Sequence, residues 1–367
     1  MKRLARTLLW KWRRRHAAER VRLQRAILGG CDMVGIDVGA AEGLQPHWWA
    51  FEGIVEMYLF EPHDESANKL RALYATSPYE HMFHVMPMGL GAATAERDFY
   101  LLNAPTGSSL YPIDASSEFA GPDNRYVHPV RATKVQVRKL SEVLDEQRLP
   151  RVDIAKLDVQ GAELEILLGL DEERLASLVL VEAEVNISGG ITRTTSPYVG
   201  VPTWADLDRF FLSHGMRLLD LSVSRSHRAK GGDSDWYQRE IFRTYTNSPG
   251  VSAAAWEADV VYIRDYRSLI AGRNADALRR LVIALCAYRF FSEAIFAIEQ
   301  AEHSGLFAAE EARRVRQAIG DWHRLTAHRP WHGRGRFWRI WRAALGRLGV
   351  AQYRRWKQYM WFDYPNG

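Results

Sequence analysis

Apolar positions between residues 31 and 264 gather into short continuous runs separated by polar or glycine-rich turns. The runs predict strands, and stretches with apolar positions every three or four residues predict helices. We expect strands at 33–38, 55–60, 84–88, 98–102, 134–137, 154–158, 178–185, 217–221 and 258–264. We expect helices between them at 65–75, 140–147, 162–169 and 204–214. Strands alternating with helices predict an α/β fold with a doubly wound, mostly parallel sheet.

Both ends of the chain lack this alternation. Residues 2–28 read as a basic amphipathic helix that stops at the Gly29-Gly30 pair. Residues 266–327 show only helical periodicity, which predicts an αα-hairpin and therefore an all-α extension. The predicted domains are the N-terminal helix, the sheet domain, the helical module and a basic Trp/Arg-rich tail, at 1–30, 31–265, 266–327 and 328–367.

Composition excludes several classes of protein. Of the 367 residues, 47% are hydrophobic and 25% are charged, which is ordinary for a folded globular chain. The sequence contains no run of about 18 apolar residues, so no membrane-spanning helix is predicted. Two cysteines, Cys31 and Cys286, are too few for a disulfide scaffold or a four-thiolate zinc site. A reducing compartment fits this usage, and without a secretory apolar run at the N-terminus we expect a cytoplasmic protein.

The formal net charge of +5 is unevenly distributed. Residues 1–28 hold ten Lys/Arg against one acid, and residues 321–367 hold ten against two, so the body between them is acidic. Six of the thirteen tryptophans lie between 322 and 361. Rings among arginines suit a membrane interface, which would place the protein at the inner face of the membrane. They would equally suit packing of the tail on the acidic body, and both alternatives stay open.

The first candidate motif follows the 33–38 run. It reads Gly-Ile-Asp-Val-Gly-Ala-Ala-Glu-Gly from Gly35 and contains Asp37, Gly39 and Gly43. Glycine lets a ligand approach the backbone, and a helix start after such a turn favours an anionic group. The spacing differs from the G-x-G-x-x-G dinucleotide fingerprint. A tight turn without any ligand is the alternative interpretation.

Two further signals lie at the ends of predicted strands. Glu61 ends the second run, where a carboxylate can accept both hydroxyls of a ribose. Asp158, in Lys-Leu-Asp-Val-Gln-Gly-Ala-Glu from Lys156, ends the 154–158 run, where a doubly wound sheet places its ligand crevice. The order and spacing of the three signals are more specific than any one of them.

With two later runs, LVLVEAEV and ADVVYIR, these blocks resemble the FkbM family of class I S-adenosylmethionine-dependent methyltransferases over roughly residues 31–264. The resemblance implies a Rossmann-like domain that transfers a methyl group from S-adenosylmethionine to a hydroxyl of a sugar, glycan or related small molecule. It implies that Gly39 and Gly43 cradle the methionine part, that Asp37 orients this loop or binds the amino group, and that Glu61 binds the ribose. His63 is a candidate cofactor contact, and Met88 and Gly89 would border the adenine.

An alcohol is a poor nucleophile at neutral pH, so a carboxylate base helps. Asp158, which the resemblance places near the sulfonium and the acceptor, is the first candidate. Glu163, Glu182 and Glu184 are reserves, with Glu184 and Ser109 also expected at the substrate pocket. Glu163 would equally serve as a stabilising helix-start carboxylate, and Ser109 as part of a plain hairpin turn. Asp158, Glu163 and Glu182 form an oxygen set compatible with Mg²⁺, although dependence on Mg²⁺ is not expected. No His or Cys spacing supports a softer metal.

The resemblance, together with the basic ends, therefore implies an O-methyltransferase of a bacterial-type surface glycan or lipid-linked precursor, active in polysaccharide biosynthesis. A nucleic-acid methyltransferase is a first alternative, which would bind RNA or DNA through the basic ends. A non-catalytic interaction protein that retains the fold is a second, and the set Gly39, Gly43, Glu61 and Asp158 argues against it. The acceptor, the methylated position and the oligomeric state are left open.

Overall fold

The computed structural model describes residues 17–45, 47–103, 105–114, 129–187, 198–226 and 254–327. Its strands are β1 (Met33–Val38), β2 (Val55–Phe60), β3 (Phe83–Met86), β4 (Gly89–Gly91), β5 (Ala95–Leu102), β6 (Pro129–Lys139), β7 (Ile154–Leu157), β8 (Leu180–Asn186), β9 (Met216–Ser226) and β10 (Ala254–Arg264). Its 3₁₀ helices are η1 (Trp48–Phe51), η2 (Glu80–Met82) and η3 (Pro105–Gly107).

A first α-helix covers residues 17–28. The others are α2 (Asp64–Tyr74), α3 (Leu140–Glu146), α4 (Glu163–Leu168), α5 (Glu172–Ser177), α6 (Trp204–Ser213), α9 (Tyr266–Ala271), α10 (Ala275–Ala287), α11 (Phe291–His303) and α12 (Ala309–Ala327).

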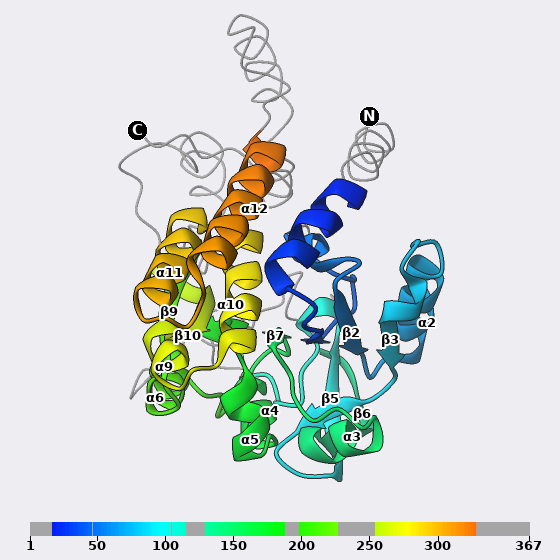
Figure 1. Ribbon diagram of the computed structural model, residues 1–367. Coiled ribbons are helices and arrows are strands. Elements are labelled where there is room, and N and C mark those ends of the chain that lie inside the picture. Colours follow the sequence, from blue (N-terminus) through cyan, green and yellow to red (C-terminus); the bar gives the residue numbers. More distant parts are fainter. Residues whose placement is uncertain are drawn as a thin grey trace, which may run out of the picture. The chain divides into compact units, whose positions relative to one another are not determined.

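A seven-stranded sheet organises these elements (Figure 1), with strand order β3-β2-β1-β7-β8-β10-β9. Strands β3, β2, β1, β7 and β8 pair in parallel, and β10 runs antiparallel to β8. The strand order reverses between β1 and β7, the position where a doubly wound sheet opens its crevice. A smaller three-stranded sheet has the order β4-β6-β5, with β5 antiparallel to β6.

Alternation along the strands gives the large sheet two buried faces. In β1, Val34, Ile36 and Val38 face a core that also contains side chains of α3, α4, α5 and α6. Met33 faces a second core with side chains of helix 17–28, η1, α2 and α9–α12. Helices on both faces of a mostly parallel sheet confirm the predicted doubly wound α/β class, and α9–α12 confirm the all-α extension.

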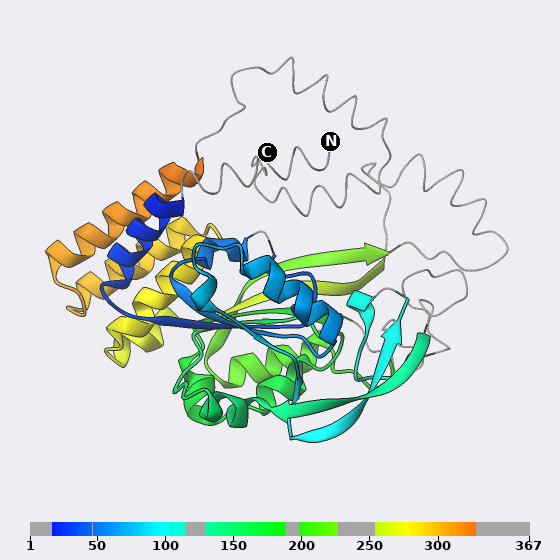
Figure 2. The ribbon, with the colours of Figure 1, turned by 90° about the vertical axis from the view of Figure 1, so that its right-hand side faces the viewer.

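The extension is part of the same compact unit as the sheet, which runs to Arg225 and resumes at Ala255–Leu325. Residues 281–287 of α10 are all buried, as expected of a helix enclosed on every side. In Figures 1 and 2, helix 17–28 (dark blue) lies beside α12 (orange), and both contribute to one core. The predicted domain boundaries themselves stay predictions.

Several expected elements differ from those observed. No α-helix follows the Gly39–Gly43 loop, because the chain makes turns there and then only η1. The run at 84–88 ends as a strand at Met86, and Gly89 begins a separate strand of the smaller sheet. The expected helix over 2–28 is described from residue 17 onward, and the basic tail 328–367 lies outside the described residues. Among the helices that are described, none has the length and apolar character to cross a membrane.

Candidate functional site

The switch point between β1 and β7 brings together three of the predicted signals. Asp37 on β1 lies in register with Lys156 on β7, so the loops that follow the two strands leave side by side. The amide of Gly39 donates to the carbonyl of Phe60 at 3.0 Å, and the amide of Asp158 donates to the carbonyl of Val38 at 3.0 Å. These bonds hold the glycine loop between the ends of β2 and β7.

Gly39 is required by the close approach of two backbones. Its φ is +84°, and a Cβ atom there would lie 1.9 Å from the carbonyl oxygen of Asp158. Gly43, with φ +77°, would place a Cβ 3.1 Å from the hydroxyl of Tyr74, which accepts the amide of Leu44. The amides of Gly39 and Ala40 both donate to Phe60, so the loop does not present them as a helix-start anion site.

A buried lysine separates two carboxylates in this crevice. Lys156 Nζ lies 3.1 Å from Asp158 Oδ2 and 3.7 Å from Asp37 Oδ1. Burial alone would lower the pKa of Lys156, but Asp158 and Asp37 outweigh it and hold the pKa above the usual range. Burial raises the pKa of Asp37 to about 6 against the effect of Lys156. Among the described residues, no group hydrogen bonds to either oxygen of Asp37.

Glu61 lies directly after β2, as the sequence predicts, and is buried. Its Oε1 accepts the backbone N–H of His63 at 2.8 Å, and no described residue donates to Oε2. Burial raises the pKa of Glu61 although the amide of His63 lowers it. The carbonyl of Met86 accepts the amides of Glu61 and Met88, which brings Met88 and the following Gly89 to the end of β2. The Nδ1 atom of His63 lies 3.3 Å from the hydroxyl oxygen of Ser66.

Gln160 connects the groups around Asp158, a role that the sequence did not reveal. Its φ is +60°, a strained backbone for a residue with a side chain. Its amide nitrogen donates to Asp158 Oδ1 at 3.2 Å and to Glu184, and its amide oxygen accepts the hydroxyl of Tyr198 at 2.9 Å. Its place before Gly161 in the Asp158 motif was the available signal, whereas nothing in the local sequence marks Tyr198.

Asp158 and Glu184 form a carboxyl pair with opposite pKa shifts. Burial would raise the pKa of Asp158, but Lys156 and the hydrogen bond with Glu184 hold it below its ordinary value. Burial, followed by the charges of Asp158 and Glu257, raises the pKa of Glu184 well above its ordinary value. Asp158 is therefore the member of the pair that ionises first as the pH rises, and Glu184 is the member that holds its proton to higher pH. Such a division is typical of paired carboxyls with distinct acid and base roles.

Glu163 binds the turn that precedes its own helix. It accepts the amide of Val159 through Oε1 at 3.1 Å and the amide of Gly161 through Oε2 at 3.0 Å. Burial raises the pKa of Glu163 to about 7, although these backbone hydrogen bonds lower it. The geometry agrees with the stabilising helix-start interpretation, because both oxygens are engaged by the turn that carries Asp158.

Glu163→Gln is expected to flatten the pH dependence of stability. Because the folded-state pKa of about 7 lies above the ordinary 4.5, the folded chain binds more protons than the unfolded chain between these values. The stability from this group is complete below pH 4.5 and is lost as the pH rises through 7. Removing it should reduce that loss by on the order of 3 kcal/mol. Urea unfolding across this range measures it, with helix-start Glu172→Gln as control, and equal slopes in wild type and Glu163→Gln would contradict the assignment.

Glu182 lies in register with Lys156 and is held by side chains from outside the sheet. Its Oε2 pairs with His47 at 2.8 Å and accepts hydrogen bonds from the indole of Trp48 and the hydroxyl of Tyr288. Burial would raise the pKa of Glu182, but His47, Lys156 and Tyr288 together lower it to about 2. A carboxylate with so low a pKa is a weak base. This geometry favours a fixed charge over the catalytic role expected from the sequence.

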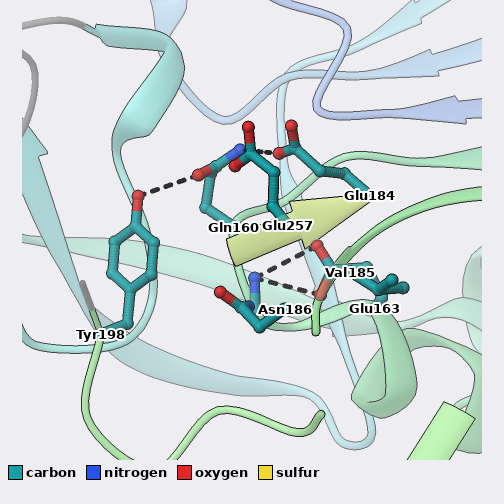
Figure 3. Close-up of a pocket in the computed structure, with 8 residues that line it drawn as sticks. Gln160, Glu163, Glu184, Val185, Asn186, Tyr198 and Glu257 are labelled. Atoms are coloured by element: carbon teal, nitrogen blue, oxygen red, sulfur yellow. Dashed lines mark hydrogen bonds between the residues drawn. The ribbon is translucent and has the colours of Figure 1, made fainter. Parts of the chain in front are cut away.

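A small hollow lies beside the carboxyl pair (Figure 3), with about 240 Å³ of space including its open mouth. In Figure 3, Tyr198 points toward Gln160, and Glu163 toward the backbone of the turn. The lining groups are mostly polar: Gln160, Gly161, Glu163, Glu184, Val185, Asn186, Tyr198 and Glu257. Ser109 lies behind this wall, where its hydroxyl donates to the carbonyl of Gln160 at 2.7 Å. Ser109 is fully buried, so it fixes the shape of the hollow from outside.

The residues fit an S-adenosylmethionine site in two respects. Glu61 has a carboxylate oxygen without a protein donor at the end of β2, and Asp37 has two buried oxygens without hydrogen-bond partners among the described residues. A ribose diol and an amino group are donors that such oxygens accept. No metal site is found among the described residues, because they contain no group of three His, Cys, Asp or Glu side chains placed to hold an ion.

Comparison with known proteins agrees with this geometry. Residues 37–218 match the family model of the methyltransferase FkbM domain. The chain is 34% identical over 109 residues to Methyltransferase 1 of Beauveria bassiana, covering 27% of this chain and 43% of that protein. It is 28% identical over 183 residues to the AMB antimetabolite synthetase AmbE of Pseudomonas aeruginosa, covering 42% of this chain and 8% of that one. The chain thus spans less than half the length of these curated relatives.

Among solved structures, a methyltransferase FkbM from Methylobacillus flagellatus KT aligns with 14% sequence identity and a TM-score of 0.32. The alignment covers 64% of this chain and 45% of that one. The matched family domain begins at Asp37 and contains Gly39, Glu61 and Asp158, which meet at the switch point of the sheet. Through this domain, residues 37–218, the chain belongs to the FkbM methyltransferase family.

Proposed function

We propose that this chain transfers a methyl group from S-adenosylmethionine to a hydroxyl oxygen of a sugar, glycan or related small-molecule acceptor. The observation that carries the proposal is the position of Asp158. It is an ionised carboxylate at the switch point of the sheet, oriented by Lys156 and Gln160, beside a polar hollow. The family domain supplies the reaction class, and the proposal extends it to the acceptor.

The cofactor supplies a methyl group on a positively charged sulfonium. Glu61 binds the ribose through its carboxylate, and Met88 and Gly89 border the adenine. Gly39 and Gly43 shape the loop beside the methionine part, with Asp37 as acceptor for its amino group. Three carboxyls, Asp37, Asp158 and Glu182, surround the single lysine Lys156 at the switch point of the sheet. This excess of acidic groups complements the positive charge of the donor.

Asp158 is the base in this proposal. Its carboxylate accepts the proton of the acceptor hydroxyl while the new oxygen–methyl bond forms and the sulfur–methyl bond breaks. Lys156 and Gln160 hold the two oxygens of Asp158 at 3.1 and 3.2 Å and so fix its orientation. Alignment contributes much of the rate for such a transfer, and a positioned base contributes typically 10²–10⁴-fold.

The polar lining of the hollow supports a hydroxyl-rich acceptor. The amides of Gln160 and Asn186, the carboxyls of Glu184 and Glu257 and the hydroxyl of Tyr198 offer donors and acceptors together. Nucleic acid is less favourable at this place, because the phosphates of a polyanion would be repelled by the carboxylates. Attachment of the basic ends to a membrane remains a prediction.

Calorimetric titration of the full chain with S-adenosylmethionine and S-adenosylhomocysteine, with and without Mg²⁺, tests the cofactor. We expect saturable one-site binding that does not depend on Mg²⁺. Methyl transfer from isotopically labelled cofactor to a panel of sugars, lipid-linked glycans, small hydroxylated molecules and RNA tests the acceptor. Labelled RNA alone would favour the nucleic-acid alternative. Absence of cofactor binding in a folded chain would favour the non-catalytic alternative.

Glu61→Gln is expected to weaken S-adenosylhomocysteine binding by about 10- to 100-fold, because a hydrogen bond to a charged group contributes about 1.5–3 kcal/mol. Glu56→Gln on the same strand is the matched control, since Glu56 is half exposed and pairs with His84 at 2.9 Å. Calorimetry of both variants measures the difference. Equal affinity in wild type and Glu61→Gln would reject the ribose assignment.

A further inference from the structure

The helical extension places the side chain of Tyr288 beside a row of charged residues in the sheet, Asp37, Lys156 and Glu182. Helix α10 is anchored by Arg279, which donates to the carbonyl of Ile27 at 2.6 Å, and by Arg280, which donates to the carbonyl of Asp32 at 2.8 Å. Helix α10 ends at Ala287 with Tyr288 as its C-cap, and Arg289 follows with φ +66°, a left-handed residue that stops the helix. These contacts fix where the Tyr288 hydroxyl lies.

That hydroxyl donates to Glu182 Oε2, and the ring of Tyr288 packs edge-on against His47 with centroids 5.0 Å apart. Glu182 thus gathers three donors, from His47, Trp48 and Tyr288, on one oxygen. Tyr288 lies outside the matched family domain, which ends at residue 218. The contact therefore joins the extension to the domain at a buried charge.

The charge of Glu182 matters because of its neighbour in the sheet. The register places Asp37, Lys156 and Glu182 side by side on β1, β7 and β8. The lysine Nζ contacts Asp37 and Asp158, at 3.7 and 3.1 Å. A Glu182 carboxylate that lacked its outside donors would compete for the same ammonium group, since its own hydrogen-bonding capacity would be unfilled.

We propose that Tyr288 is a positioning residue of the methyl-transfer site, which by holding Glu182 leaves the ammonium of Lys156 to Asp37 and Asp158. The inference rests on the proposed function. The helical extension then contributes to the site, since Tyr288 keeps Lys156 paired with the base Asp158. The groups that face Glu182 are His47, Trp48, Lys156 and Tyr288, with Asp259 of the antiparallel strand also acting on it electrostatically.

The test compares the full-length chain with Tyr288→Phe and Tyr266→Phe. Tyr266 is a buried tyrosine of α9 in the same helical region, and its hydroxyl has no hydrogen bond with the described residues. The pH dependence of kcat and KM, the affinity for S-adenosylhomocysteine and the urea midpoint are measured for all three. We expect Tyr288→Phe alone to lower kcat/KM about tenfold, mostly in kcat, and to move the acid limb of its profile to higher pH.

A second readout needs no activity. Carboxyl-carbon NMR of the ligand-free chain follows the titration of Asp158, and we expect its pKa to rise in Tyr288→Phe because Lys156 moves toward Glu182. An unchanged Asp158 titration with unchanged kinetics, whatever the stability loss, would overturn the proposal. If wild type neither binds cofactor nor methylates, the proposed function has failed, and the NMR comparison still decides the role of Tyr288.

Discussion

Asp158→Asn is expected to lower kcat for methyl transfer by about a hundred- to a thousandfold, within the range of a positioned base. Asparagine keeps the shape of the side chain and can still accept the hydrogen bond from Gln160, but it cannot take up the hydroxyl proton. Steady-state kinetics with the identified acceptor measures the loss. Binding of S-adenosylhomocysteine, which lacks the sulfonium charge, is expected to change little, since Asp158 acts on the acceptor.

Asp98→Asn serves as its control, because Asp98 is a half-exposed carboxylate of β5 that pairs with Lys134 at 2.8 Å. Glu184→Gln separates the two members of the carboxyl pair. A near wild-type rate in Asp158→Asn with a large loss in Glu184→Gln would move the base to Glu184. A large loss of cofactor affinity in Asp158→Asn, with kcat retained, would instead place Asp158 in the cofactor site.

Gly39→Ala is expected to abolish cofactor binding and to lower the free energy of unfolding by about 2–5 kcal/mol. A side chain at φ +84° costs about 1–2 kcal/mol. The methyl group would also lie 1.9 Å from the carbonyl oxygen of Asp158, and such overpacking costs about 1–3 kcal/mol more. The loop must therefore move away from the strand end that carries the base.

Gly305→Ala is the matched control for backbone strain alone. Gly305 has φ +68° and lies between α11 and α12, and a Cβ there meets no atom within 4 Å. Urea unfolding and calorimetry of both variants distinguish the two costs. Similar destabilisation in both, with cofactor affinity retained in Gly39→Ala, would show that the approach to Asp158 does not shape the site.

The fold class was predictable because its signal is local and repeated. Each buried strand, such as Met33–Val38, is a mostly apolar run bounded by turn residues, and the runs alternate with helical periods. The prediction of a helix after Gly43 was wrong, because a tight glycine turn is compatible with more than one following conformation. A 3₁₀ turn forms there instead, and its Trp48 and Phe51 are buried in the core.

The site was predictable in part for a related reason. Asp37, Glu61 and Asp158 each lie at or just after the carboxyl end of a predicted strand, so the parallel sheet must bring them to one edge. Gln160 was within the same motif, but its contacts with Asp158 and Glu184 depend on a left-handed backbone that propensity does not predict. For Glu163 and Ser109, the residues were identified while their partners, backbone amides and a carbonyl, depend on the fold.

By itself, the sequence determined the alternation of strands and helices, the glycine loop and the carboxylates at strand ends, because these depend on neighbours along the chain. Only the tertiary structure decided which of those carboxyls are charged. Lys156 and Glu184 lower the pKa of Asp158 against burial, and burial with the charge of Asp158 raises the pKa of Glu184. Tyr288 donates to Glu182 from 106 residues away. Protonation depends on burial and on nearby charges in space, and neither is written in local sequence.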